Sequence, residues 1–134
     1  MSERICIFRV WDKHKKIYFN SSNNNIAYLK TYLDYVDQSD HGAASFSILE
    51  SDLVLLQYTG MVDTKEQKIW EGDVVEYSNS REGMKFNAEV VYDTKTARFK
   101  IISPKYQFDL YDMNDYYGHI TVIGNIFQNP ELLN

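Results

Sequence analysis

Two acidic residues flank a glycine near the middle of the chain, in the run Glu71-Gly72-Asp73. Two carboxyl groups this close together are suited to general acid–base chemistry, but no residue at a recognisable spacing supplies a partner base or nucleophile. The competing interpretation is a turn. Gly72 can adopt a positive φ at no steric cost, and Asp73 can accept a backbone hydrogen bond two residues further on. We favour the turn, so these residues predict a fold feature and no active site.

Residue types that bind metals are present but poorly spaced. The three histidines are far apart in the chain: His14, His41 and His119. Protein zinc sites usually take two ligands that are close in sequence, which argues against zinc. Three aspartates are closer together: Asp109, Asp112 and Asp115. A calcium loop would also need a glycine and a closing glutamate, which are missing here, so we predict a solvated acidic loop. We expect no metal, no cofactor and no catalytic residue.

The densest basic cluster surrounds His14. Its members are Lys13, Lys15 and Lys16, with Trp11 and Tyr18 close by in the sequence. Such a group suits contact with a phosphate and stacking on a base. A charged hairpin tip that protects an edge strand from pairing is the alternative, and we prefer it because so few positions do not make a nucleic-acid groove.

Composition limits the classes of protein that fit. The chain has 134 residues, a net charge of −5 and an aromatic content of 15%. That length holds one domain, or a domain with a small subdomain, and the acidic balance argues against sequence-independent binding of nucleic acid. One cysteine, Cys6, excludes an internal disulfide framework, and we expect it to be an inert buried thiol. No signal-peptide core or membrane-length apolar window is present, which predicts a cytoplasmic protein without membrane contact.

Hydrophobic periodicity predicts a mainly β (α+β) protein with one helix. Residues 4–11 form a β-branched and aromatic strand, and residues 16–19 return as its hairpin partner. Apolar residues between 25 and 37 recur at helical spacing, which predicts a helix there. From residue 46 onward, short runs of alternating apolar and polar residues are separated by polar turns, the pattern of a small barrel or sandwich.

Turn-forming and aromatic residues recur at the boundaries of these elements. Gly60 permits a tight turn or a bulge, and Thr59 can bond locally. Near the C-terminus, Asn129 suits a helix cap and Pro130 the first helical position. The positions that we expect to specify the fold are Trp11, Asp12, Tyr58, Thr59, Gly60, Trp70, Glu71, Gly72, Asp73, Gly124, Asn125, Asn129 and Pro130.

An ordered set of segments resembles the YopX-like family of phage and prophage proteins from Gram-positive bacteria. The segments are Arg9–Asp12 with Lys16–Tyr18, Leu56–Asp63, Ile69–Val75, Glu89–Asp93 with Phe99, and Val122–Leu133. The resemblance implies an SH3-like barrel in the C-terminal part, a smaller N-terminal piece and a mobile-element origin. No catalytic residues are known for that family, so the resemblance transfers none. The chain departs from the family pattern at Thr64–Gln67, where the usual turn glycine is missing.

These observations together predict two regions and a binding role. Residues 1–50 form a hairpin-plus-helix subdomain, and residues 51–134 form an SH3-like barrel. The leading hypothesis is a non-enzymatic phage or prophage accessory protein that acts through protein–protein contact or self-assembly as a homo-oligomer. The alternative is a nucleic-acid-binding barrel, and an enzyme acting on a small metabolite ranks third.

Overall fold

The computed structural model describes residues 8–13, 16–18, 53–113 and 118–134. The chain divides into two compact units, residues 1–57 and 58–134, and the division falls inside one strand, β3 (Leu53–Val62). Each unit is described by itself. The helix predicted at 25–37 and Cys6 lie outside the described residues. The predicted domain boundary after residue 50 stays a prediction.

The N-terminal unit is built around a central strand, β1 (Phe8–Asp12). It pairs antiparallel with β2 (Ile17–Tyr18) on one side and with the first half of β3 on the other. The predicted hairpin between the first two strands is therefore confirmed. In this unit Val10, Trp11 and Leu56 are buried, as expected for a strand whose apolar residues face both ways.

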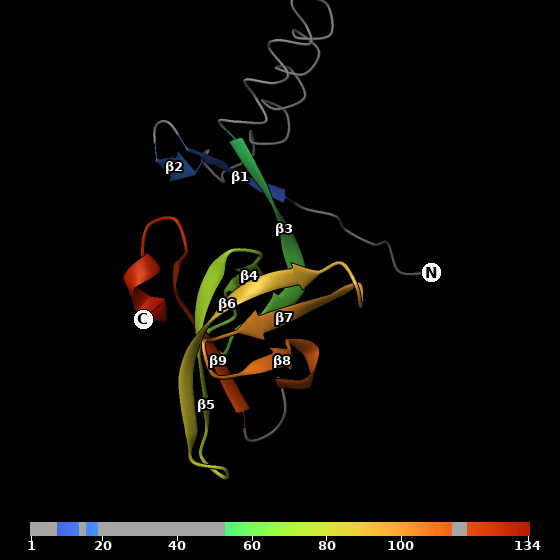
Figure 1. Ribbon diagram of the computed structural model, residues 1–134, viewed down its shortest axis with the longest axis vertical. Helices are drawn as coiled ribbons and strands as arrows, with labels where there is room; N and C mark the ends of the chain where they lie inside the picture. The colour runs from blue at the N-terminus through green and yellow to red at the C-terminus, as the bar shows by residue number, and fades with distance from the viewer. Residues whose placement is uncertain (1–7, 14–15, 19–52, 114–117) are drawn as a thin grey trace, which may run out of the picture. The chain divides into compact units, whose positions relative to one another are not determined.

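The C-terminal unit contains a five-stranded antiparallel sheet with the strand order β8-β7-β6-β5-β9 (Figure 1). The strands are β5 (Asp73–Asn79), β6 (Met84–Asp93), β7 (Arg98–Ile102), β8 (Gln107–Asp109) and β9 (Gly118–Asn125). The second half of β3 pairs with β4 (Lys68–Trp70) in the same unit. Two short 3-10 helices follow strands: η1 (Tyr111–Met113) and η2 (Pro130–Leu133).

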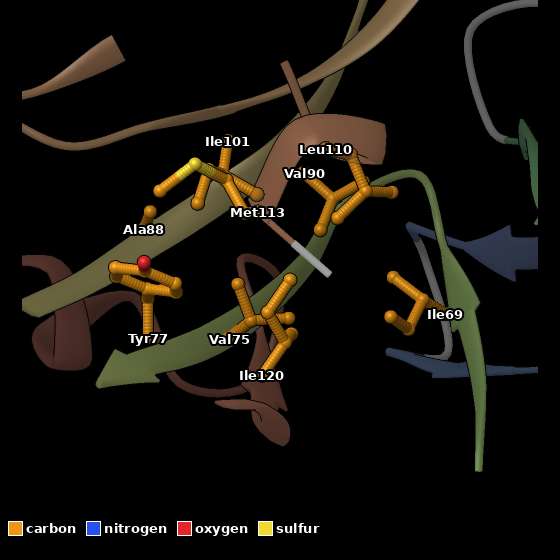
Figure 2. Packing of buried hydrophobic residues seen from close by; sticks show 9 residues of the cluster. All are labelled: Ile69, Val75, Tyr77, Ala88, Val90, Ile101, Leu110, Met113 and Ile120. Carbon is orange, nitrogen blue, oxygen red and sulfur yellow. The ribbon is translucent and has the colours of Figure 1, made fainter. Parts of the chain in front are cut away.

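Side chains of one face of the sheet form the core of this unit. Strand alternation places Val75 and Tyr77 of β5 opposite Ala88 and Phe86 of β6. The fully or nearly buried members converge in Figure 2: Ile69, Val75, Tyr77, Ala88, Val90, Ile101, Leu110, Met113 and Ile120. Burial of each larger aliphatic side chain stabilises the unit by about 1.5–3 kcal/mol relative to leaving it exposed. The segment around η1 brings Leu110 and Met113 into this core.

The prediction of a mainly β protein is confirmed. The short alternating runs predicted from residue 46 onward include the segments that form β6, β7, β8 and β9. Within the described ranges the only helical elements are the two 3-10 turns. No helix in that part of the chain has the length and apolar character needed to cross a membrane.

Candidate functional site

The turn between β4 and β5 contains the carboxyl groups singled out in the sequence. Gly72 has φ +85°, which confirms the predicted need for glycine. Asp73 Oδ2 accepts from the backbone N–H of Trp70, three residues earlier, at 2.8 Å, which is a different donor from the one that the sequence suggested. Gly72 also donates its N–H to Val90 O and accepts from Ile126 N–H. This turn thus links β6 to the segment after β9.

Glu71 meets a different acid from the one that the sequence suggested. Its carboxyl group lies near that of Glu89 on β6, and burial followed by repulsion from Glu89 raises the pKa of Glu71. Burial also raises the pKa of Glu89, whose direct cross-strand neighbours are Val74 and Ile102. No described lysine, arginine or histidine forms an ion pair with either glutamate. The arrangement is a half-buried carboxyl pair without a compensating cation.

The Tyr58-Thr59-Gly60 step lies where the pairing of β3 with β4 becomes irregular, which is compatible with a bulge, one of the two predicted alternatives. The register between β3 and β4 shifts between Tyr58 and Val62, and Gly60 has φ +85° with open space around it. Thr59 Oγ1 donates to Ile69 O at 2.7 Å and accepts from Met61 N–H. The ring of Tyr58 lies 5.4 Å from that of Trp70, its cross-strand neighbour. These positions stabilise the strand pair and surround no reacting group.

Asp63 was part of the family motif, but its role was not foreseen. It is 6% exposed, and its carboxylate accepts three backbone N–H groups. Oδ1 takes those of Lys65 and Gln67, and Oδ2 takes that of Val122 on β9. The turn that lacks the family's glycine places Glu66 at φ +63° instead. Three-residue hairpin loops commonly end with one residue in this left-handed region, so a glutamate here carries the strain that a glycine would avoid.

The C-terminal motif begins with a second polar network, around Asn125. Its Oδ1 accepts from the N–H groups of Phe127 and Gln128, and its Nδ2 donates to Gln128 Oε1. Asn129 occupies the N-cap position of η2, as predicted, but its side chain makes no cap hydrogen bond. Its Oδ1 instead accepts from Asn125 N–H. Pro130 occupies the start of η2, as predicted.

The glycine at position 124 is required by packing. A Cβ atom there would lie 2.5 Å from Asn129 Oδ1 and 2.9 Å from Leu132 Cδ1. Leu132 O also accepts from Asn87 Nδ2 on β6 at 2.9 Å. The segment through η2 is therefore held against the outer face of the sheet, the face opposite the core.

Trp11 and Asp12 lie in the N-terminal unit, apart from the positions above in the sequence. Trp11 is buried and its ring meets that of Tyr18 edge-on at 4.8 Å. Asp12 O accepts from Lys16 N–H, which closes the turn after β1. Lys13 and Lys16 are exposed at this turn, while Lys15 and His14 lie outside the described residues.

The remaining candidates for metal binding do not converge. Asp109 Oδ2 accepts from Arg98 Nη1 at 2.8 Å, and His119 is on β9 at the opposite edge of the sheet. His41 and Asp115 lie outside the described residues. Among the residues that are described, no group of three potential metal ligands comes together.

Two tyrosines form the most exposed aromatic region of the C-terminal unit. Tyr92 is 39% exposed, and its ring meets that of its cross-strand neighbour Phe99 edge-on at 5.0 Å. Leu110 N–H donates to Phe99 O, so the following residue, Tyr111, emerges at the same end of the sheet with 82% of its surface exposed. We call Tyr92, Phe99 and Tyr111 the tyrosine surface; Arg98, next to Phe99 in β7, projects from the opposite face of that strand.

Sequence reasoning missed the tyrosine surface and the Glu71–Glu89 pair. The aromatic excess was visible, but periodicity alone does not tell which aromatic residues end outside the core. The two glutamates belong to a turn and to a later strand, and the pairing of β5 with β6 and the Gly72–Val90 hydrogen bond bring those segments together. The one available signal for the pair was Glu89 itself, an acidic residue that stands between the apolar residues Ala88 and Val90 in a predicted strand.

Comparisons with known proteins give one family and one fold. The model of the family described as YopX protein matches residues 7–134. The crystal structure of protein EF1440 from Enterococcus faecalis superposes with a TM-score of 0.58 and 21% identity, over 98% of this chain and 100% of that one. The crystal structure of protein yopX from Bacillus subtilis gives 0.50 and 16%, over 95% and 97%. No match is found among curated proteins.

Proposed function

The chain belongs to the YopX family, and we propose that it is a non-enzymatic phage or prophage accessory protein that acts through protein–protein contact. The tyrosine surface carries this proposal. Tyrosine is enriched among the residues that dominate binding energy at protein interfaces, and two exposed tyrosines lie toward the same end of the sheet here. Tyr92 and Phe99 are already ordered by their mutual packing, which lowers the entropy cost of binding.

The basic residues of β7 do not favour a nucleic-acid partner. Arg98 is bound to Asp109, and Lys100 Nζ lies 3.0 Å from Asp93 Oδ2, on the face of the strand opposite Phe99. A phosphate backbone needs basic groups that are free to replace counterions, and both of these already have an acidic partner.

The same proposal includes the finer architecture and location. We infer that the strands of 51–134 form an SH3-like barrel, that a helix follows the N-terminal hairpin, and that the protein acts in the cytoplasm. The bulge in β3, the irregular register between β5 and β9 and the curvature of the strands in Figure 1 support the barrel. The partner is another protein or a second copy of the chain.

A capture experiment tests the function. Tagged full-length protein is incubated with lysate of a Gram-positive host, with and without nuclease, beside the double variant Tyr92→Ala/Tyr111→Ala and the control Ser80→Ala. Ser80 is exposed in the loop between β5 and β6, at the other end of β6. We expect one specific protein to be retained with nuclease by the parent and the control, and lost by the double variant. A capture that vanishes with nuclease would establish nucleic-acid binding instead.

A further inference from the structure

The two edge strands of the five-stranded sheet, β9 and β8, differ in whether their outward backbone groups are hydrogen-bonded. At one edge, β9 presents Ile120 O and Val122 N–H away from β5. Thr64 N–H donates to Ile120 O at 2.9 Å, and Asp63 Oδ2 accepts from Val122 N–H at 2.9 Å. The turn after β3 therefore occupies this edge in the way that another strand would.

The other edge is β8, and its register fixes which groups point outward. Ser103 N–H donates to Tyr106 O, and Leu110 N–H donates to Phe99 O. Hydrogen-bonded and non-bonded pairs alternate along an antiparallel ladder, so the pair between these two, Ile101 with Phe108, is also hydrogen-bonded. The residues on either side of Phe108 must then direct their backbone groups away from β7.

Those residues are Gln107 and Asp109. Each turns one N–H and one C=O to the free edge. Within the described part of the chain, no backbone or side-chain group is hydrogen-bonded to these four groups. The pairing of β6 with β7 agrees with this alternation. Ile101 directs its backbone groups to β8, so its partner Val90 must direct its own away from β7, and Val90 O accepts from Gly72 N–H on that side.

The side chains beside this edge offer different surfaces on the two faces. On the core face, Phe108 packs with Tyr106 and Phe86, with ring centroids 5.9 and 6.0 Å from that of Phe108, and all three rings are half-buried. On the other face, Asp109 is neutralised by Arg98. An added strand would bring alternate side chains against these two faces, one apolar and one polar.

We propose that β8 is an acceptor edge for an extended peptide segment of a protein partner, which adds as a further strand beside Gln107–Asp109. The segment alternates apolar and polar residues, contains no proline at the paired positions and places an apolar side chain against Phe108. Main-chain hydrogen bonds give such complexes their affinity and the alternate side chains give them specificity. This inference rests on the proposed function, because it names the class of partner and the mode of contact.

The probe for the test is a displayed library of random nine-residue peptides, selected on the full-length protein. The dissociation constant of a selected peptide is then measured by fluorescence anisotropy for the parent, Gln107→Pro and Gln107→Ala. Proline removes the outward N–H and leaves the ladder to β7 intact, since edge strands tolerate proline where the N–H faces solvent. Alanine removes only the side chain and is the matched control.

We expect Gln107→Pro to weaken binding about tenfold or more, the loss of roughly one hydrogen bond, and Gln107→Ala to change it less than about twofold. Hydrogen exchange at the amides of Gln107 and Asp109 should slow when the peptide binds. Failure to select any peptide would overturn the proposal, as would equal affinity for the parent and the proline variant.

Two further arms keep the outcome interpretable. If circular dichroism shows that Gln107→Pro is unfolded, N-methylation of alternate amides in the peptide tests the same bonds from the other side, and unchanged affinity would overturn strand addition. A peptide that binds the proline variant normally but is lost on Tyr111→Ala would end the edge proposal and leave protein contact through the tyrosine surface standing.

Discussion

Asp63 and the Glu71–Glu89 pair show two environments for carboxyl groups in one unit. Asp63 is almost fully buried, and every one of its close partners donates a hydrogen bond. The two glutamates are less buried, yet burial and mutual repulsion raise the pKa of Glu71. The oxygens of Asp63 meet backbone N–H groups, which replace the water that a buried carboxylate loses, whereas the oxygens of Glu71 meet a second carboxylate, which does not.

The carboxyl groups compared here all lie in the C-terminal unit, so the free energy of unfolding should be measured for that unit alone. The chain has two tryptophans, Trp11 and Trp70, one in each compact unit. A Trp11→Phe background leaves Trp70 as the only tryptophan, so its fluorescence reports denaturant unfolding of the C-terminal unit. The variants below are compared in that background.

The largest effect is expected from removing the Asp63 carboxylate. Asp63→Ala leaves three backbone N–H groups without their acceptor, one of them on the half-buried Val122, and should lower the free energy of unfolding by about 3 kcal/mol. Asp63→Asn keeps one acceptor oxygen, which can serve either the Lys65 and Gln67 side or the Val122 side, so its loss should be intermediate. Equal midpoints for the parent and Asp63→Ala would contradict the role assigned to this residue.

A smaller loss is expected at Asn125, which uses a neutral side chain for the same purpose. Asn125→Ala removes the acceptor for Phe127 and Gln128 N–H and should cost about 2 kcal/mol in the same denaturation assay. Asn125→Asp keeps both acceptor bonds and loses only the donation to Gln128 Oε1. It should therefore retain more stability than the alanine variant at pH 7, and the reverse order would show that the amide donor dominates.

Neutralising one member of the glutamate pair should raise the free energy of unfolding, whereas the substitutions at Asp63 and Asn125 lower it. Because the pKa values of Glu71 and Glu89 are raised in the folded state, folding favours their protonated forms. Their contribution to stability is greatest at or below the ordinary value of 4.5 and is lost as pH rises through the folded pKa values. Glu89→Gln should therefore stabilise the unit at pH 7, by less than Asp63→Ala destabilises it.

The measurement is the difference between variant and parent unfolding free energies across pH 4 to 8. The difference should grow with pH, and Glu82→Gln, at an exposed position in the loop between β5 and β6, is the control. The variant must be compared with the parent at each pH because other carboxyl groups also titrate. The hydrogen bond to Lys100 lowers the pKa of Asp93, so the contribution of Asp93 to stability is lost as pH falls, opposite to that of the glutamates. A Glu89→Gln difference that falls with pH would show that the pair is stabilised when ionised.

The smallest effect is expected in the turn that Asp63 closes. Glu66→Gly removes the cost of a left-handed side-chain-bearing residue and should raise stability by at most about 1 kcal/mol. Ala97, at φ +55° in the loop before β7, is the matched position, and Ala97→Gly should give a similar gain. A loss at residue 66 alone would mean that the Glu66 side chain contributes a contact of its own.

Local rules were enough to predict much of the fold. The strands from β5 to β9 follow from alternation, and Gly60, Gly72 and Pro130 stand where backbone geometry requires them. Asp63 was not predictable in the same way, because one of its three donors, Val122, is far away in the sequence. Asn129 stands at the predicted N-cap position, but its side-chain oxygen accepts from Asn125 N–H, which precedes it in the chain, and makes no cap hydrogen bond. Tertiary packing decides which distant segment supplies a hydrogen-bond donor and which of several nearby groups a side chain bonds to.

The pairing of β9 with β5 has a consequence for the order in which the protein is made. The hairpins of β5 with β6, β6 with β7 and β7 with β8 join neighbours, so each can form as the chain leaves the ribosome. β9 emerges after all of them, yet it supplies the partner for β5, the donor for Asp63 and the segment that lies against Gly72. A nascent chain halted before β9 would hold four ordered strands with β5 uncovered, a substrate for chaperones and for mispairing between neighbouring chains.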